Sequence, residues 1–190
     1  RAMAVAGCSP ADLDMIMVAT VTGDRPLPST AALLQRKLGD GLRCAAVDLQ
    51  AACAGFLYGL SMADAVLRTG AQRRILLVGV EVLSRFVDWE DRSTCVLFGD
   101  GAGAVVLEAR DVPGGVRSTH LGCQGDLADI LTIPAGGSAA PAAAATIEER
   151  GHFVRMQGRD VFRVAVKELA SICMSAIEAN RLSGDCLDWV

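Results

Sequence analysis

Residues 47–56 read Val-Asp-Leu-Gln-Ala-Ala-Cys-Ala-Gly-Phe, a stretch that sets one cysteine between a predicted strand and a predicted helix. The strand is Cys44 to Leu49, an almost continuous apolar run. The helix runs from about Ala54 to Thr69, where Gly70 supplies a C-terminal stop. Cys53 therefore lies at a helix N-terminus, in a sharp strand-to-helix turn.

This position favours a reactive thiol. Unpaired backbone N–H groups and the positive end of the helix dipole favour the thiolate, which is the nucleophilic form of cysteine. The same N–H groups can hold the oxyanion that forms when a thioester carbonyl is attacked. Small neighbours leave room for a ligand to reach the sulfur: Ala51, Ala52, Ala54 and Gly55. The local pattern leaves open the alternative that Cys53 is only a small core residue, since free cysteine is among the most buried residue types.

The composition bounds the class of protein. A chain of 190 residues suits one large domain or two small ones. A formal charge of −4 shows neither the basic footprint of a nucleic-acid-binding protein nor a polybasic membrane patch. No apolar run approaches the roughly 18 residues that span a bilayer, and no secretory leader opens the chain. We therefore expect neither nucleic acid nor membrane as a partner.

The seven cysteines are an odd number with no C-x-x-C pair, and several lie inside apolar segments. This usage predicts reduced thiols in a cytoplasmic protein rather than a disulfide framework. His120 and Cys123 form a lone H-x-x-C, but no second ligand pair follows. The sequence therefore predicts no metal site and no other cofactor.

The first part of the chain alternates strands with helices, which is typical of a layered α/β fold. The Ala54 helix is apolar nearly all round and is predicted to be buried. The other predicted elements are a helix ended by Gly7, a strand at Met15–Ala19, a helix capped by Ser29 or Thr30 that runs through Lys37, and a strand at Ile75–Val80.

Gly99 to Ala104 match the pattern G-x-G-x-x-A, which suggests a dinucleotide site. That motif must open a helix, yet the next residues, Val105 to Leu107, are rich in β-branched side chains and predict a strand. The better interpretation is a tight glycine turn that joins this strand to a strand at Cys95–Phe98.

The second part of the chain begins at a predicted boundary, Val112-Pro113-Gly114-Gly115. An Ala-, Gly- and Ser-rich stretch from Ala135 to Ala145 is predicted to be a mobile loop. Apolar periodicity predicts a helix from Arg159 to Leu182. Strands are predicted at residues 116–121, 152–154 and 184–190.

Together these motifs resemble the β-ketoacyl-acyl carrier protein synthase III family of the thiolase-like superfamily. The matches occur in order along nearly the whole chain: Asp48-x-x-Ala51-Ala52-Cys53-Ala54-Gly55-Phe56; Asp91-Arg92 followed by Phe98-Gly99-Asp100-Gly101-Ala102-Gly103-Ala104; Ser118-Thr119-His120; Met156-x-Gly158-x-x-Val161-Phe162; and Leu187-Asp188-Trp189. Five ordered matches are more specific than any one alone, and they favour the reactive interpretation of Cys53.

The resemblance implies an α/β fold with a thiolase-like layered αβαβα architecture of two similar halves. Residues 1–112 would form the first half and residues 113–190 the beginning of the second. Family members are longer at both ends, so we expect this chain to be an internal fragment that lacks the start of the first half and the end of the second.

The resemblance also implies an activity that initiates fatty acid synthesis. Cys53 would take an acyl group, acetyl in the simplest case, from acyl-coenzyme A. The enzyme, a homodimer, would then condense this group with malonyl-acyl carrier protein and release carbon dioxide. The family stabilises the enolate with a His and an Asn, and its Pro-His-Gln-Ala-Asn motif is expected directly after Val190. Neither His120 nor His152 matches that position, so we expect the 190 residues alone not to complete condensation.

The resemblance also implies roles for residues that match functional positions of the family. Arg92 matches an arginine that stacks on the coenzyme A adenine, although in isolation it could be a loop charge paired with Asp91. Leu27 matches a residue that reaches into the partner's pocket, where many members carry Phe, and a smaller residue there would alter primer length. Arg159 lies near the tunnel mouth and would suit an acidic carrier protein or a phosphate. The remaining matches are Leu83, Leu97, Phe98 and Leu131 around the acyl pocket, and Met156, Gly158 and Phe162 along the pantetheine tunnel.

Three other functions remain open. A related condensing enzyme could transfer an acyl group in secondary metabolism. A degradative thiolase would need a second, C-terminal cysteine. From a different class, the chain could be a non-catalytic acyl-binding or dimer-scaffold protein.

Overall fold

The computed structural model describes residues 1–188, which form two compact units. Unit 1 consists of Arg1–Val82 and Asp100–Pro113, and unit 2 consists of Leu83–Gly99 and the residues from Gly114 on. The predicted boundary at residues 112–115 coincides with the last change of unit. Residues 83–99 group with unit 2, whereas the division into two similar halves at residue 112 stays a prediction. Trp189 and Val190, which end the last motif and the last predicted strand, lie outside the described residues.

Unit 1 contains a four-stranded sheet in the order β2-β1-β3-β4. β1 pairs in parallel with β2 and β3, and β4 pairs antiparallel with β3. The strands are β1 (Met15–Ala19), β2 (Ala45–Leu49), β3 (Arg74–Val82) and β4 (Asp100–Glu108). The helices are α1 (Ala2–Ala6), η1 (Pro10–Asp12), α2 (Thr30–Leu38), η2 (Ala52–Ala54) and α3 (Gly55–Arg68). This alternation confirms the predicted α/β class.

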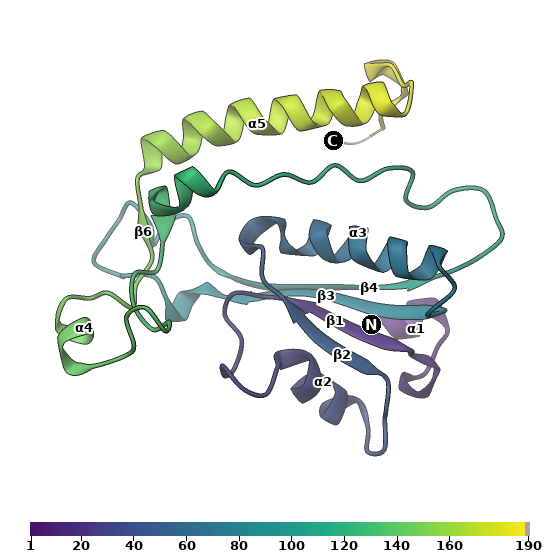
Figure 1. Cartoon of the computed structure of the whole chain (residues 1–190), viewed down its shortest axis with the longest axis horizontal. Coiled ribbons are helices and arrows are strands. Elements are labelled where there is room, and N and C mark those ends of the chain that lie inside the picture. Colours follow the sequence, from purple (N-terminus) through teal and green to yellow (C-terminus); the bar gives the residue numbers. More distant parts are fainter. Residues whose placement is uncertain (189–190) are drawn as a thin grey trace. The chain divides into compact units, whose positions relative to one another are not determined.

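Two helices cover the opposite faces of this sheet, α2 on one and α3 on the other (Figure 1). Successive side chains of β1 alternate between the faces, as a strand requires: Ile16 packs on the α2 side and Met17 on the α3 side. The buried cluster beneath α2 comprises Leu13, Ile16, Val18, Ala31 and Leu76, and the cluster beneath α3 comprises Met17, Ala63, Ile75 and Leu77.

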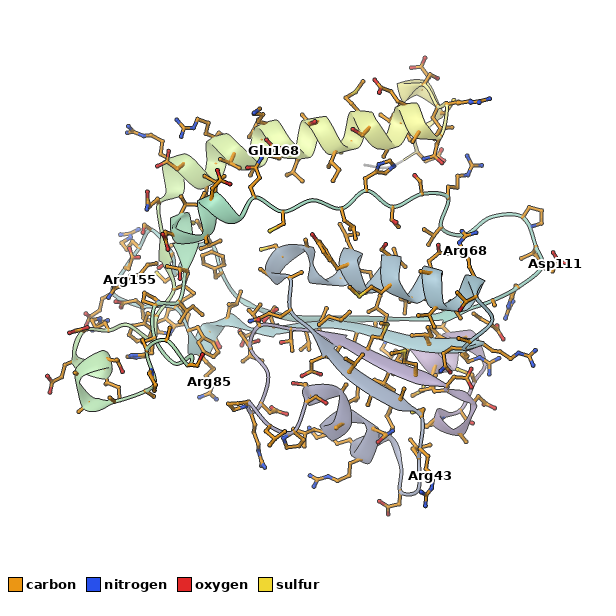
Figure 2. All side chains as sticks on the ribbon, viewed as in Figure 1. Arg43, Arg68, Arg85, Asp111, Arg155 and Glu168 are labelled. Atoms are coloured by element: carbon orange, nitrogen blue, oxygen red, sulfur yellow. The ribbon has the colours of Figure 1, made fainter. Side chains whose placement is uncertain are left out.

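Helix α3 packs on the sheet through a stripe of small residues. Gly55, Gly59 and Ala63, spaced four apart, are its buried residues. A methyl group at Gly59 would lie only 2.5 Å from a Leu77 methyl, so the helix sits as close as glycine permits. The helix ends at Arg68, which is labelled in Figure 2. The Arg68 Nε donates to Asp64 at 2.6 Å.

The prediction that the Ala54 helix is buried all round is wrong. Leu57 is 58% exposed and Met62 is 44% exposed. One sheet buries only one stripe of a helix, and a second covering layer is needed to bury the rest.

The glycine-rich run at residues 99–104 forms neither a nucleotide-binding loop nor a turn. Asp100 to Ala104 belong to β4, where Gly103 pairs with Gly79 and Ala104 with Val78 of β3. The exclusion of a helix is thus confirmed, but the predicted turn is wrong. Residues 95–98 are predicted as a strand, but residues 95–97 form a turn and Phe98 is irregular. Residue type alone does not distinguish a glycine turn from a glycine-rich strand. The strand forms here because β3 is available to pair with it.

Unit 2 is built around one long helix and a short two-stranded sheet. Its elements are η3 (Leu83–Arg85), η4 (Gly125–Ile130), β5 (Leu131–Thr132), α4 (Ala144–Glu148), β6 (Arg155–Met156), α5 (Gly158–Ala179) and η5 (Gly184–Cys186). α5 confirms the predicted helix, and β5 pairs antiparallel with β6. Residues 116–121 and 152–154 are not strands, and Gly184–Cys186 is a helical turn. No helix among residues 1–188 is long and apolar enough to cross a membrane.

Candidate active site

Cys53 follows the carboxyl end of β2 and lies in η2, the single turn that leads into α3. Its side chain is exposed. The alternative that Cys53 is a buried core residue is therefore wrong for the described chain. The parallel strand pair continues to Ala19 and Leu49, and the Thr20 N–H then donates to the Leu49 carbonyl at 3.1 Å. The cysteine thus projects from the edge where two parallel strands end.

The turn that presents Cys53 is strained at the preceding residue. Ala52 has φ 45°, a left-handed conformation that costs a residue with a side chain about 1–2 kcal/mol. The Ala54 N–H donates to the Ala51 carbonyl at 3.1 Å, and the Gly55 N–H donates to the Ala52 carbonyl. These two donors are therefore used inside the turn. The N–H of Cys53 itself makes no hydrogen bond with any described residue.

We expect Ala52→Val to lower the free energy of unfolding by about 1–3 kcal/mol, because a β-branched residue tolerates positive φ poorly. Ala52→Gly should cost nothing measurable, since glycine adopts this conformation without a steric penalty. Ala54→Val, at φ −86°, is the matched control for the added volume. Denaturant unfolding gives the three values, and equal losses at positions 52 and 54 would contradict a strained turn.

Asp48, the one charge within β2, caps helix α2. Its carboxylate oxygens accept the N–H groups of Thr30 and Ala31, each at 2.7 Å. Ser29 completes the cap by accepting the Ala32 N–H at 3.2 Å, which confirms the predicted Ser29 alternative. A carboxylate at a helix N-terminus satisfies orphan N–H groups and the helix dipole together. The sequence motif included Asp48 without a role, and its signal was a lone charge in an apolar strand.

Asp48→Ala is expected to destabilise the protein by about 2 kcal/mol, because two helix N–H groups lose a charged acceptor. Asp48→Asn should lose roughly half as much, since the amide retains one acceptor oxygen. Asp64→Ala, which removes an exposed pair with Arg68, should change stability by less than about 0.5 kcal/mol and is the charge-matched control. Thermal unfolding of the three variants checks the order, and an Asp48→Ala variant as stable as Asp64→Ala would refute the capping role.

Glu81 of β3 fixes the loop that carries Leu27. Its carboxylate accepts the Val21 N–H at 2.9 Å and the Thr22 hydroxyl at 2.6 Å. The Thr22 hydroxyl oxygen accepts the Val82 N–H at 2.8 Å. Sequence reasoning missed this role, because the partners lie about sixty positions apart and carry no shared pattern. Leu27 itself is 83% exposed.

Arg92 lies in a loop of unit 2 and is exposed. The alternative that it pairs with Asp91 is wrong, because the Asp91 carboxylate is engaged by its neighbours. It accepts the Ser93 N–H at 2.9 Å, the Ser93 hydroxyl at 2.7 Å and the buried Thr94 hydroxyl at 2.8 Å. These hydrogen bonds, with that of the Ser93 hydroxyl foremost, hold the pKa of Asp91 below its usual value. Arg92 makes no ion pair within residues 1–188.

Three of the predicted pocket residues meet in unit 2. Leu131 of β5 pairs directly with Met156 of β6, and a methyl group at Gly158 would lie 3.4 Å from the Met156 Cε. The others divide by exposure: Leu83 and Phe98 are half-buried, and Leu97, Arg159 and Phe162 are exposed. Cys53 and Leu27 belong to unit 1, and their approach to these residues stays a prediction.

The two histidines lie in different surroundings. His120 Nε2 lies 3.0 Å from the Ser118 hydroxyl, which also accepts the Asn180 side-chain amide at 2.7 Å. The His152 ring packs on Phe153 with 4.0 Å between centroids. Among the described residues, no three His, Cys, Asp or Glu side chains are grouped as metal ligands.

Comparison with known proteins gives consistent matches. The family profile described as 3-Oxoacyl-[acyl-carrier-protein (ACP)] synthase III matches residues 47–125, a segment that contains both Cys53 and Arg92. The chain is 45% identical over 184 residues to Beta-ketoacyl-[acyl-carrier-protein] synthase III of Roseiflexus castenholzii, covering 97% of this chain and 56% of that protein. The chain thus spans little more than half the length of the curated relatives it matches.

Solved structures agree with the sequence matches. The 3-oxoacyl-[acyl-carrier-protein] synthase III of Aquifex aeolicus is 38% identical, with a TM-score of 0.82 over 95% of this chain and 54% of that one. The priming β-ketosynthase of the R1128 polyketide biosynthetic pathway is 32% identical, with a TM-score of 0.80 over 96% of this chain and 53% of that one. These likenesses confirm the predicted thiolase-like α/β fold. With the ordered motifs around Cys53, they show that the chain belongs to the β-ketoacyl-acyl carrier protein synthase III family.

Proposed function

We propose that this protein transfers an acyl group, acetyl in the simplest case, from acyl-coenzyme A to Cys53. The whole protein, of which we expect these 190 residues to supply the acylation step, then condenses that group with malonyl-acyl carrier protein. The observation that carries the proposal is the exposed Cys53 in its strained strand-to-helix turn, inside the segment that the family profile matches. The names of the curated relatives support the same activity.

The first step is a thioester exchange. The Cys53 thiolate attacks the acyl carbonyl carbon, a carbon–sulfur bond forms, and the carbonyl oxygen takes up the negative charge. The N–H of Cys53, which has no hydrogen-bond partner among the described residues, is our candidate donor to that oxyanion. The tetrahedral intermediate then expels the coenzyme A thiolate, which takes up a proton from solvent, and the acyl group stays on the sulfur.

The second step forms a carbon–carbon bond. Malonyl-acyl carrier protein loses carbon dioxide, the resulting carbanion attacks the acyl carbon on Cys53, and the thiolate leaves. The enolate formed on decarboxylation needs hydrogen-bond donors, and neither His120 nor His152 matches the position of the histidine that supplies one in the family. The proposal needs no metal or organic cofactor, since both substrates arrive as activated thioesters.

The binding roles follow the family match and remain proposals. Arg92 would stack on the coenzyme A adenine, and its exposed guanidinium, without an ion-pair partner in residues 1–188, is available for that. Leu131, Met156 and Gly158, which lie together in unit 2, would line the acyl and pantetheine path. Leu83, Leu97, Phe98 and Phe162 would complete its wall, and Arg159 would lie at its mouth. The homodimer is proposed on the same ground.

Leu27→Phe should shift the preference toward shorter acyl groups, because an aromatic side chain reaching into the partner's pocket would leave less room for the acyl chain. The ratio of acylation rates with acetyl- and butyryl-coenzyme A measures the shift. An unchanged ratio would show that Leu27 does not contact the acyl chain.

Intact-mass measurement after incubation with acetyl-coenzyme A tests the proposal. We expect one acetyl adduct on the wild-type protein and none on Cys53→Ala. Cys123→Ala, which removes another exposed thiol, should acylate like the wild type. A folded wild-type protein that forms no adduct would exclude the proposed enzyme and favour an acyl-binding or scaffold function.

A second candidate is a condensing enzyme of secondary metabolism, which the likeness to the priming ketosynthase of a polyketide pathway favours. Both candidates acylate Cys53, so they differ in the acceptor. Condensation by the whole protein with a fatty-acid malonyl-acyl carrier protein supports the first candidate. Acyl-enzyme that condenses only with a polyketide carrier protein supports the second.

A further inference from the structure

The loop before Arg92 is held by an arginine about sixty positions away in the sequence. Arg150 Nε donates to Asp88 Oδ2 at 2.8 Å, and its Nη2 donates to Oδ1 of the same carboxylate. Its Nη1 lies 3.3 Å from Glu90 Oε2. All of these residues belong to unit 2. A two-pronged arginine–carboxylate pair fixes both partners in orientation as well as in distance.

The surroundings of this pair favour a firm contact. The Asp88 side chain is only 17% exposed, and the Arg150 guanidinium lies 5.1 Å from the centre of the Phe153 ring. A further backbone bond joins the same two segments, from the Val154 N–H to the Phe86 carbonyl at 2.8 Å. Arg150 holds the pKa of Asp88 below its usual value. The carboxylate is therefore charged at neutral pH, and the pair weakens only as the pH falls through that lowered pKa.

The backbone at Arg150 would suit glycine better than arginine. Arg150 directly follows the C-terminal cap of α4 and has φ 55°. Its N–H donates to the Ile147 carbonyl at 2.9 Å, and the Gly151 N–H donates to the Thr146 carbonyl at 2.9 Å. This pair of bonds is the Schellman motif, in which the left-handed position is usually glycine. The backbone conformation at position 150 is less favourable for arginine than for glycine. The stabilising contact of the arginine at this position is therefore the one its side chain makes, with Asp88.

Hydrogen-bonded turns connect Asp88, the partner of Arg150, to the segment that carries Arg92. The Asp88 carboxylate accepts the Glu90 N–H at 2.9 Å, and the Asp88 carbonyl accepts the Asp91 N–H at 3.0 Å. Asp91 in turn is held by Ser93 and Thr94. Arg92 thus lies between two anchored aspartates, and Arg150 holds the first of them.

We infer that Arg150 is a positioning residue for coenzyme A recognition: through Asp88 it fixes the loop that presents the Arg92 guanidinium to the adenine. The inference rests on the proposed function, in which Arg92 contacts the nucleotide. A residue that positions Arg92 should affect the binding only of substrates that carry the adenine nucleotide. Thioesters that end at pantetheine do not reach Arg92 and should not depend on it.

Arg150→Gly separates this role from a structural one, because glycine relieves the backbone strain while it removes the side chain. With the intact protein, we expect KM for acetyl-coenzyme A to rise about tenfold with kcat unchanged, as loss of an adenine-stacking contact would give. KM and kcat for acetyl-pantetheine should stay within about twofold of the wild type. Asp88→Asn should reproduce this split.

Two further variants complete the test. Arg92→Ala should show the same loss with acetyl-coenzyme A, and adding Arg150→Gly to it should cause no further loss, because both act through one contact. Arg163→Ala, which removes an exposed α5 arginine paired with Asp160, controls for net charge and should behave as the wild type.

The outcomes distinguish the inference from the function on which it rests. If the wild type acylates with neither thioester, the proposed function fails. If the wild type acylates and Arg150→Gly changes neither substrate or both equally, the function stands and the inference is overturned. A further loss when Arg150→Gly is added to Arg92→Ala would likewise overturn it.

Discussion

Replacing Cys53 with serine is expected to lower the rate of acyl transfer from acetyl-coenzyme A at least about 10⁴-fold. A thiolate is a strong nucleophile near neutral pH, whereas a serine hydroxyl needs an adjacent general base. Single-turnover acylation, followed by intact mass over time, gives the ratio of rates.

Two controls make this result specific. Cys53→Ser changes one exposed atom, so its thermal unfolding should match that of the wild type. Cys186→Ser removes another exposed thiol, one whose pKa is lowered mainly by the Ser183 hydroxyl, and it should acylate at the wild-type rate. Acylation of the Cys53→Ser variant within tenfold of the wild type would show that Cys53 is not the nucleophile.

Replacing Gly59 with valine is expected to lower the free energy of unfolding by about 2–3 kcal/mol. The first added carbon alone would lie 2.5 Å from a methyl of the fully buried Leu77 and 3.3 Å from one of Leu49. Helix α3 would have to move away from the sheet, and η2 with Cys53 would move with it. Denaturant unfolding measures the loss, and slower acylation should accompany it.

Met62→Val is the matched control on the same helix. It introduces the same β-branched residue at a side chain that is 44% exposed, so it carries the helix-propensity cost without the collision. We expect it to cost less than about 1 kcal/mol. Equal losses for the two variants would show that α3 is not held at glycine distance from the sheet.

The features that sequence predicts best are those set by local pattern. The apolar run before Cys53 and the periodicity of residues 159–182 gave β2 and α5. The stripe of Gly55, Gly59 and Ala63 that meets the sheet is not among the features that the sequence predicts. A helix that is apolar on every side does not reveal which side meets its neighbour.

The features that sequence did not predict depend on partners far apart in the chain. Arg150 and Asp88 lie 62 positions apart, as do Ser118 and Asn180, and no motif links the members of either pair. The composition of residues 99–104 predicts a turn, because it carries no sign of the neighbouring strand β3 with which these residues pair. Pairing along a sheet edge decides such segments, and it is a property of the fold rather than of the segment.

The most direct test of the central claim is to find which of the seven cysteines carries the acyl group. Peptide mapping of the wild-type protein after incubation with acetyl-coenzyme A, at acidic pH to preserve thioesters, locates it. We predict the acetyl group on the peptide that contains Cys53, and on no other peptide at comparable occupancy. An acetyl group spread over the exposed cysteines Cys123, Cys173 and Cys186, with Cys53 no more occupied than they are, would contradict the account.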